Sequence, residues 1–231
     1  MLFSHRNQVK RNRNSGTKKS GYKKQSEFNI PSQNRKPFYQ NINIYEQCQR
    51  NINSIKLKFI IEKLKPNYLY ACNIDEICEV LSFCPTADLE GLGLIILRQP
   101  KRKEEIFSPC WGRLIYEFDY QEKLQPAIIL EAVNIDDDIV INNYSISPFF
   151  QKEIALLIAE GHEVKITKRR IVIKKTIQAV KQTQLYRTVL HEVGHYVYKK
   201  SAYYCDSYEE KENFANAYAE NIRELLLTHT N

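Results

Sequence analysis

The sequence predicts an α+β fold, with helices at both ends of a small mixed or antiparallel sheet. Apolar residues recur at helical spacing in several segments, and short apolar runs separated by Gly, Pro and Asp fill the middle of the chain. The C-terminal third then returns to helical spacing. The 231 residues are 43% hydrophobic and 26% charged, a composition typical of a globular protein. It excludes a collagen-like protein, a coiled coil, a disulfide-rich miniprotein and a multi-span membrane protein.

The formal charge of +7 is unevenly distributed along the chain. Residues 1–40 contain ten Lys or Arg and one acid, whereas the remaining chain contains 24 basic and 26 acidic residues. The first 40 residues are also nearly free of aliphatic side chains, so they cannot bury enough apolar surface to offset the entropy of ordering. We therefore expect a basic disordered arm over 1–40, able to contact nucleic acid or an acidic partner, and one folded domain over 41–231.

The lack of a recognisable targeting signal and the cysteine spacing lead us to expect a cytoplasmic protein. No apolar run approaches the ~18 residues of a membrane span, and no apolar segment follows the early basic residues as it does in a secretory signal. The six cysteines form no CxxC pair, so reduced thiols are a better interpretation than a zinc ribbon or a disulfide framework. We expect no contact with a membrane.

The first part of the predicted domain has apolar residues at helical spacing. Apolar residues ahead of Pro66 predict a helix within 42–65, and a second, short helix is expected at 74–82. From Gly91 onward, apolar runs with turn residues between them predict four strands, at 93–97, 113–118, 127–133 and 139–141. Trp111 is expected to pack at the entry to one of these strands. Asp136, Asp137 and Asp138 lack the spacing of a calcium loop and indicate a solvated turn.

A helix is predicted at 148–160, because Pro148 suits its first turn, an apolar stripe follows, and Gly161 suits its end. We interpret His162, next in the chain, as a surface or capping residue. Two β-rich pieces are expected at 163–167 and 170–174, followed by helices at 176–199 and 208–228. The sequence leaves open whether 42–160 is an accessory part beside a metal-site part at 161–231, or whether both share one core.

The decisive motif lies in the first of these two helices, where the chain reads His191-Glu192-Val193-Gly194-His195. Residues four apart share one face of a helix, so both histidines can bind one cation while Glu192 lies beside a water on that metal. A catalytic zinc needs a third protein ligand and one open position for water. The motif therefore predicts another His, Asp or Glu nearby.

Glu212 is the predicted third ligand. Ser207 followed by Glu210 has the form of a capping box, which signals a helix start independently of any metal. Glu212 begins an otherwise small or apolar stripe on that helix, and an inward carboxylate needs a partner such as a metal ion. Two alanines on the stripe, with Gly194 on the first helix, should let the two helices approach closely. One bound Zn²⁺ is expected.

The two helices together resemble a known family. His191 to His195, followed by Glu212-Asn213-Phe214-Ala215-Asn216-Ala217-Tyr218, is similar to the HExxH and later E-x-F-A-x-A-aromatic pattern of gluzincin metallopeptidases related to anthrax lethal factor. The sequence from Ala215 to Ala219 resembles, more loosely, the corresponding helix of the ImmA/IrrE family. The resemblance covers about residues 185–225. It implies a zincin-like fold, a peptidase activity, and a tyrosine that stabilises the reaction intermediate, for which Tyr204 and Tyr208 are candidates.

Two functions follow as hypotheses. The first is a zinc-dependent endopeptidase, in which Glu192 is the catalytic general base, His191, His195 and Glu212 hold the metal, and a protein or peptide is the substrate. By analogy with the superfamily, the strand at 170–174 is expected to be the edge that pairs with an extended substrate. The second is a non-proteolytic regulatory or nucleic-acid-associated protein that uses a zincin scaffold and the basic arm.

Overall fold

The computed structural model describes residues 41–101, 110–142, 148–201 and 207–229. The chain divides into two units, Met1–Pro37 and Phe38–Asn231, and every described residue belongs to the second. The predicted arm at 1–40 lies outside the described residues, as does Tyr204. None of the helices in the described part of the chain is both long enough and apolar enough to cross a membrane.

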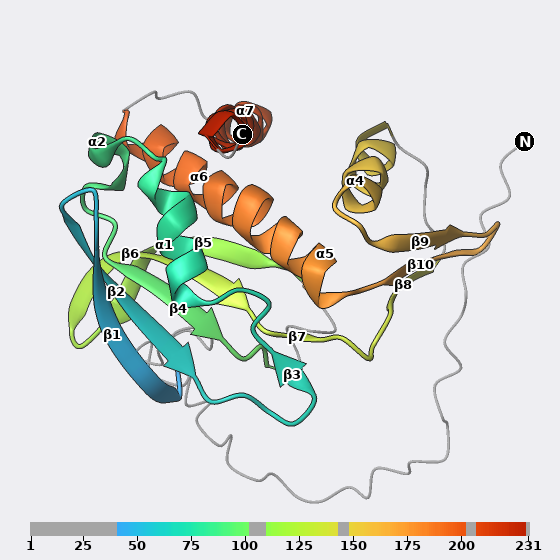
Figure 1. The fold of residues 1–231 in the computed structure, drawn as a ribbon, viewed down its shortest axis with the longest axis horizontal. Coiled ribbons are helices and arrows are strands. Elements are labelled where there is room, and N and C mark those ends of the chain that lie inside the picture. Colours follow the sequence, from blue (N-terminus) through green and yellow to red (C-terminus); the bar gives the residue numbers. More distant parts are fainter. Residues whose placement is uncertain (1–40, 102–109, 143–147, 202–206, 230–231) are drawn as a thin grey trace, which may run out of the picture. The chain divides into compact units, whose positions relative to one another are not determined.

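A five-stranded mixed sheet forms the centre of the second unit (Figure 1), which agrees with the predicted α+β class. Its strand order is β1-β2-β4-β6-β5, and β2, β4 and β6 run parallel to one another. The outer strands β1 and β5 are antiparallel to their neighbours. The bounds of the strands are β1 Ile44–Ile52, β2 Ile55–Glu62, β4 Leu94–Arg98, β5 Gly112–Tyr120 and β6 Lys123–Glu131.

The helix predicted within 42–65 is wrong, because this segment forms the hairpin of β1 and β2. Asn53 and Ser54 make the turn with φ angles of 49° and 69°, the left-handed backbone that a two-residue hairpin loop requires. Strand β2 is buried on both faces, with Leu57 in one hydrophobic cluster and Ile60 in another. A strand buried on both faces loses the alternation of apolar and polar residues, and its apolar positions then resemble those of a helix.

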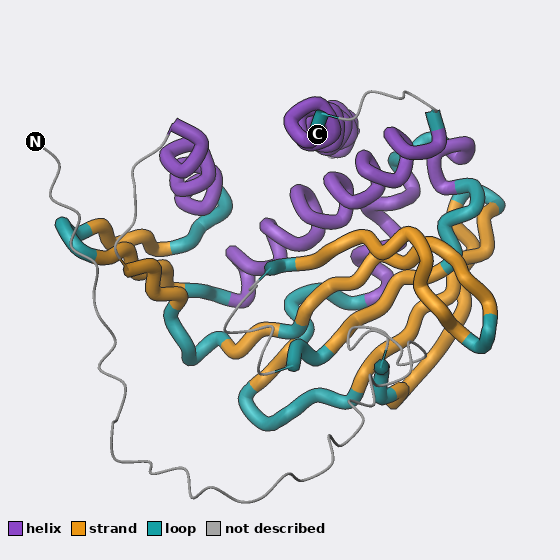
Figure 2. Tube along the Cα trace, turned by 180° about the vertical axis from the view of Figure 1, so that it is seen from behind, coloured by secondary structure: helices purple, strands orange, loops and turns teal. Residues whose placement is uncertain are grey.

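Helices cover one face of this sheet (Figures 1 and 2). They are α1 Ile74–Ser82, the short α2 Thr86–Leu89, and a continuous run of α5 Ile177–Gln182, the π-helix η2 Thr183–Val189 and α6 Leu190–Lys200. The predicted helices at 74–82 and 176–199 are thus confirmed. Phe59 and Ile128 from the sheet and Val189 and Val193 from the helical run share one buried cluster. The segments before and after residue 160 therefore contribute to one core.

A smaller three-stranded antiparallel sheet has the order β8-β10-β9, with β8 Ile139–Asn142, β9 Glu163–Ile166 and β10 Arg170–Lys174. Helix α4, Pro148–Ala159, packs Ile154 and Leu157 on Ile171 and Ile173 of β10. Gly161 follows α4 with a φ of 94°, the conformation expected at a helix end. Strands β3 Tyr68–Leu69 and β7 Val133–Asn134 form a short pair.

Helix α7, Tyr208–His229, confirms the helix predicted at 208–228. The Oγ of Ser207 accepts a hydrogen bond from the backbone N–H of Glu210 at 3.4 Å, as the predicted cap requires. Ala215, Ala219, Ile222 and Leu226 form its buried face. This face packs on α6, so the inward stripe read from the sequence is the stripe that meets the HExxH helix.

Candidate metal centre

Three potential ligands converge where α6 meets α7. His191 and His195 lie one turn apart on α6, and Glu212 lies in the second turn of α7. The Nε2 atom of His191 is 3.4 Å from Glu212 Oε2, and the Nε2 atom of His195 is 3.4 Å from Glu212 Oε1. The ligand atoms of all three side chains lie within 4.8 Å of one another. The structure thus brings together the three residues that the sequence predicted as ligands.

These spacings fit a shared cation better than direct hydrogen bonds. Zinc bonds of about 2.0–2.2 Å at tetrahedral angles separate two ligand atoms by about 3.4 Å. A charge-assisted hydrogen bond between a histidine and a carboxylate would instead bring the two atoms to about 2.7–2.9 Å. Two imidazoles and one carboxylate are also the donor set of a catalytic zinc, which keeps a fourth position for water. The residues present therefore fit zinc.

Asn216 orients one of the histidines. Its Oδ1 lies 3.0 Å from Nδ1 of His191, so Nδ1 carries the proton and donates to this oxygen. The lone pair of His191 is then on Nε2, the atom that faces Glu212. Histidine ligands usually have such a partner on the second ring nitrogen. Asn216 was not among the predicted site residues, although its position one turn after Glu212 indicates a role.

Burial favours the neutral form of both histidines. Desolvation lowers the pKa of His191 and of His195 below the ordinary value, while the negative charge of Glu212 opposes this shift at each ring. Metal ligation requires a neutral imidazole. The electrostatics of the site therefore favour the protonation state in which both rings can bind a cation.

Gly194 permits the contact between the two helices. A Cβ atom added at this position would lie 2.8 Å from Ala215 Cα, 3.0 Å from Ala215 O and 3.1 Å from Tyr218 Cβ. Ala215 is itself fully buried in the contact. The prediction that Gly194 and the small residues of α7 let the helices approach is confirmed, and this approach is what brings Glu212 to the histidines.

Glu192 is buried beside the ligands and is held by the sheet. Its Oε2 accepts a hydrogen bond of 2.8 Å from the backbone N–H of Leu114 in β5. Burial raises the pKa of Glu192 to about 7, while the Leu114 N–H opposes the shift. The HExxH motif predicts the position of Glu192 relative to the histidines. It does not predict the hydrogen bond from Leu114, which lies 78 residues earlier in the chain.

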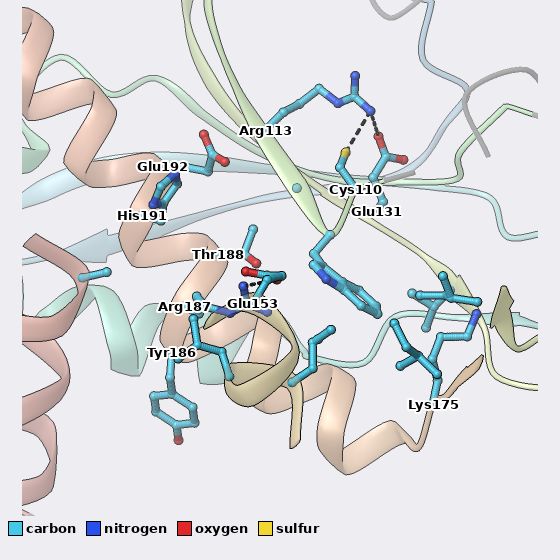
Figure 3. Close-up of a pocket in the computed structure, with 18 of the residues that line it drawn as sticks. Cys110, Arg113, Glu131, Glu153, Lys175, Tyr186, Arg187, Thr188, His191 and Glu192 are labelled. Carbon is cyan, nitrogen blue, oxygen red and sulfur yellow. Dashed lines mark hydrogen bonds and ion pairs between the residues drawn. The ribbon is translucent and has the colours of Figure 1, made fainter. Parts of the chain in front are cut away.

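A cleft of about 1240 Å³ opens beside these residues. Its lining includes His191, Glu192 and Glu212, together with residues of α4, β8 and the start of β5. Figure 3 shows residues of η2 and α6 along one side of the cleft, and Arg113 and Glu131 from β5 and β6 on the other. The two helices that carry the candidate ligands thus border a space large enough for a peptide segment.

Tyr208 lies at the mouth of this cleft and is 77% exposed. The negative charge of Glu212 raises the pKa of Tyr208, so the hydroxyl lies close enough to feel the predicted third ligand. The other tyrosine named from the sequence, Tyr204, is not among the described residues. Of the two candidates, the geometry therefore bears on Tyr208 alone.

The strand predicted to pair with a substrate is wrong. Strand β10, at 170–174, lies in the middle of its sheet and is hydrogen-bonded to β8 on one side and β9 on the other, so it has no edge to offer. Strand β5 is instead an outer strand of the five-stranded sheet, and the Leu114 N–H points from it to Glu192. The predicted edge failed because β8, about 30 residues earlier, covers it.

His162 is buried, contrary to the prediction of a surface or capping residue. Its Nε2 lies 3.0 Å from the Thr183 hydroxyl, which also donates to Glu160 at 2.6 Å. The guanidinium of Arg187 donates two hydrogen bonds to the Glu160 carboxylate, at 2.6 Å and 3.0 Å, and a third to Glu153 at 2.7 Å. This chain of contacts ties the end of α4 to the π-helix that precedes His191 and His195.

Trp111 agrees with its predicted role, since it packs at the start of β5 beside the ring of His162. Asp136, Asp137 and Asp138 are exposed, as expected for a solvated turn. The described residues contain no other His, Cys, Asp or Glu group with ligand spacing besides the one at His191.

Comparisons with protein families, with curated proteins and with solved structures find no match to this chain.

Proposed function

We propose that the protein is a zinc-dependent endopeptidase with a zincin-like fold. The observation that carries the proposal is the convergence of His191, His195 and Glu212, at 3.4 Å spacings, beside the buried carboxylate of Glu192 on the wall of a cleft. A histidine pair alone would support only a metal site. A carboxylate adjacent to that site is what hydrolysis additionally requires.

Zinc, when bound, supplies a Lewis acid and lowers the pKa of its bound water towards about 7. His191, His195 and Glu212 would hold it, and Asn216 keeps the His191 proton on Nδ1. Glu192 takes a proton from the attacking water and later gives it to the leaving amine. Because the Leu114 N–H holds Oε2, the proton is carried on Oε1.

The peptide would lie along the outer edge of β5. Backbone groups on an open strand edge can pair with an extended chain, which gives affinity without demanding a particular side chain. Leu114 connects this edge directly to Glu192, so a peptide on β5 passes next to the proposed base. Tyr208, at the cleft mouth, is available to donate its hydroxyl to the developing oxyanion.

The test is turnover of an unstructured peptide mixture by the zinc-loaded protein and by Glu192→Gln, with cleavage products identified by mass spectrometry. The proposal predicts cleavage by the wild type, and a rate at least about 100-fold lower in Glu192→Gln at equal zinc content. Glu210→Gln, a change at an exposed residue of the same charge, should cleave like the wild type. Equal rates in the wild type and Glu192→Gln would remove the proposed base.

A further inference from the structure

The hairpin of β9 and β10 carries a dense positive charge outside the metal site. Residues 163–175 contain six Lys or Arg and one acid, although the chain beyond residue 40 has slightly more acidic than basic residues. Lys165, Lys168, Arg169 and Arg170 are exposed, and none of the four forms an ion pair with a described residue. Glu163, the single acid, faces Lys174 at 3.9 Å.

The turn of this hairpin is fixed by its own hydrogen bonds. The N–H of Thr167 donates to the Arg170 carbonyl at 2.9 Å, and the Thr167 hydroxyl donates to the same carbonyl at 2.8 Å. The Arg170 N–H donates back to the Thr167 hydroxyl at 3.2 Å. Lys168 and Arg169 are thereby held at the tip of a preformed loop, so a ligand that binds them orders little additional backbone.

Helix α4 packs on one face of this hairpin, and the other face points away from it. Ile171 and Ile173 of β10 are buried against α4, while Arg170, Val172 and Lys174 alternate with them and face away. Lys165 lies directly opposite Val172 in the register and shares that outer face. In Figures 1 and 2 the turn lies at the end of the hairpin away from the five-stranded sheet.

The metal site does not account for these charges. Of residues 163–175, only Ile173 and Lys175 line the cleft. These four cations lie on the hairpin turn and its outer face, and exposed like charges so close together repel one another when nothing binds them. Such a cluster lowers stability slightly in the free protein and therefore points to an anionic partner.

We propose that the β9–β10 hairpin is a nucleic-acid contact in which Lys165, Lys168, Arg169 and Arg170 bind backbone phosphates. Exposed lysine and arginine side chains neutralise backbone phosphates, a contact that depends on charge and needs no particular base sequence. The tip residues Thr167, Lys168 and Arg169 are polar, and Ile166 beside them is 55% exposed. A single half-exposed side chain offers too little apolar surface for insertion into a lipid layer, which favours a polyanion in water. The basic residues of 1–40 add to the attraction for the same partner.

The test uses the full chain and a fluorescent DNA duplex of about 20 base pairs, with affinity measured by anisotropy between about 50 and 200 mM KCl. The test variant is K168Q/R169Q/R170Q. The control is K56Q/K63Q/K123Q, which removes three exposed lysines from elsewhere on the domain. Each lost phosphate contact lowers the slope of log affinity against log salt by about 0.9. The hairpin variant should therefore lose about 2.7 from the slope and about 100-fold or more in affinity near 0.1 M salt.

Equal slopes for the hairpin variant and the control would overturn the proposal, as would a larger loss of binding to vesicles of anionic phospholipid than to DNA. The single variant K168Q, with a predicted slope change of about 0.9, guards against misfolding of the triple variant. Neither variant changes a residue of the metal centre, so zinc content and peptide cleavage stay unchanged whatever the DNA result. The two proposals therefore fail separately.

Discussion

Replacing Gly194 by alanine should weaken zinc binding more than it weakens folding. The new Cβ would lie 2.8 Å from Ala215 Cα and 3.0 Å from Ala215 O. Carbon atoms in contact prefer about 3.5–4.0 Å, so α7 has to move away from α6 by roughly 0.7 Å or more. Metal sites tolerate errors of about 0.2 Å in ligand distance. The shift moves Glu212 away from its best distance to a zinc held by the two histidines.

The cost to folding is smaller because two effects oppose each other. Overpacking of a tight contact costs about 1–3 kcal/mol, and alanine in a helix interior regains about 1 kcal/mol relative to glycine. The unfolding free energy of the zinc-free protein should therefore fall by about 0–2 kcal/mol. Zinc affinity should fall by about 10- to 100-fold, the range for loss of support around a ligand.

The assay is zinc affinity by competition with a chelator, alongside urea unfolding of the zinc-free protein. The second substitution Ala215→Gly should not rescue zinc binding, because the new Cβ meets the Cα and carbonyl oxygen of Ala215, which glycine keeps. Wild-type zinc affinity in Gly194→Ala would show that Glu212 does not depend on this helix contact, and the reasoning would be refuted.

Three further predictions concern other parts of the structure. Asn216→Ala should lower zinc affinity by about 10- to 100-fold in the same competition assay. Asn216→Asp should retain the affinity, because aspartate still accepts the hydrogen bond from His191. Equal loss in both variants would contradict this role of Asn216. Arg187→Met leaves the partly buried carboxylates of Glu153 and Glu160 without their cation and should lower the urea-measured free energy of unfolding by about 3–5 kcal/mol, against little change for Glu210→Gln. A loss under about 1 kcal/mol would argue against a stabilising role for these two ion pairs. Burial raises the pKa of Cys72 and of Cys84 to about 12, so both remain protonated and resist iodoacetamide at pH 8 in the native protein; mass spectrometry showing their rapid alkylation would be the contrary result.

Local spacing explains why so much of the metal centre was predictable. The interval between His191 and His195 is one helical turn, and a capping residue marks the start of the helix that bears Glu212. Both signals depend only on neighbours in sequence. Asn216 could have been added by the same logic, because it follows Glu212 by one turn.

The errors share a different physical cause, because each depended on a partner far away in the chain. The 42–65 segment became strands since β2 pairs with β4, about 35 residues later, and is buried on both faces. Strand β10 lost its expected edge to β8, and His162 became buried through Thr183 and Trp111. Periodicity cannot separate a strand buried on both faces from a helix, and it carries no information on sheet order.

The most direct test of the metal centre is the zinc content of the purified protein beside that of Glu212→Ala, measured by elemental analysis after dialysis against metal-free buffer. The geometry predicts about one zinc per chain in the wild type and near-complete loss in Glu212→Ala, because two histidines alone hold the ion weakly. Glu209→Ala, a change at an exposed acid three residues earlier, should retain the metal. Equal zinc in the wild type and in Glu212→Ala, or none in the wild type, would contradict the assignment of this site.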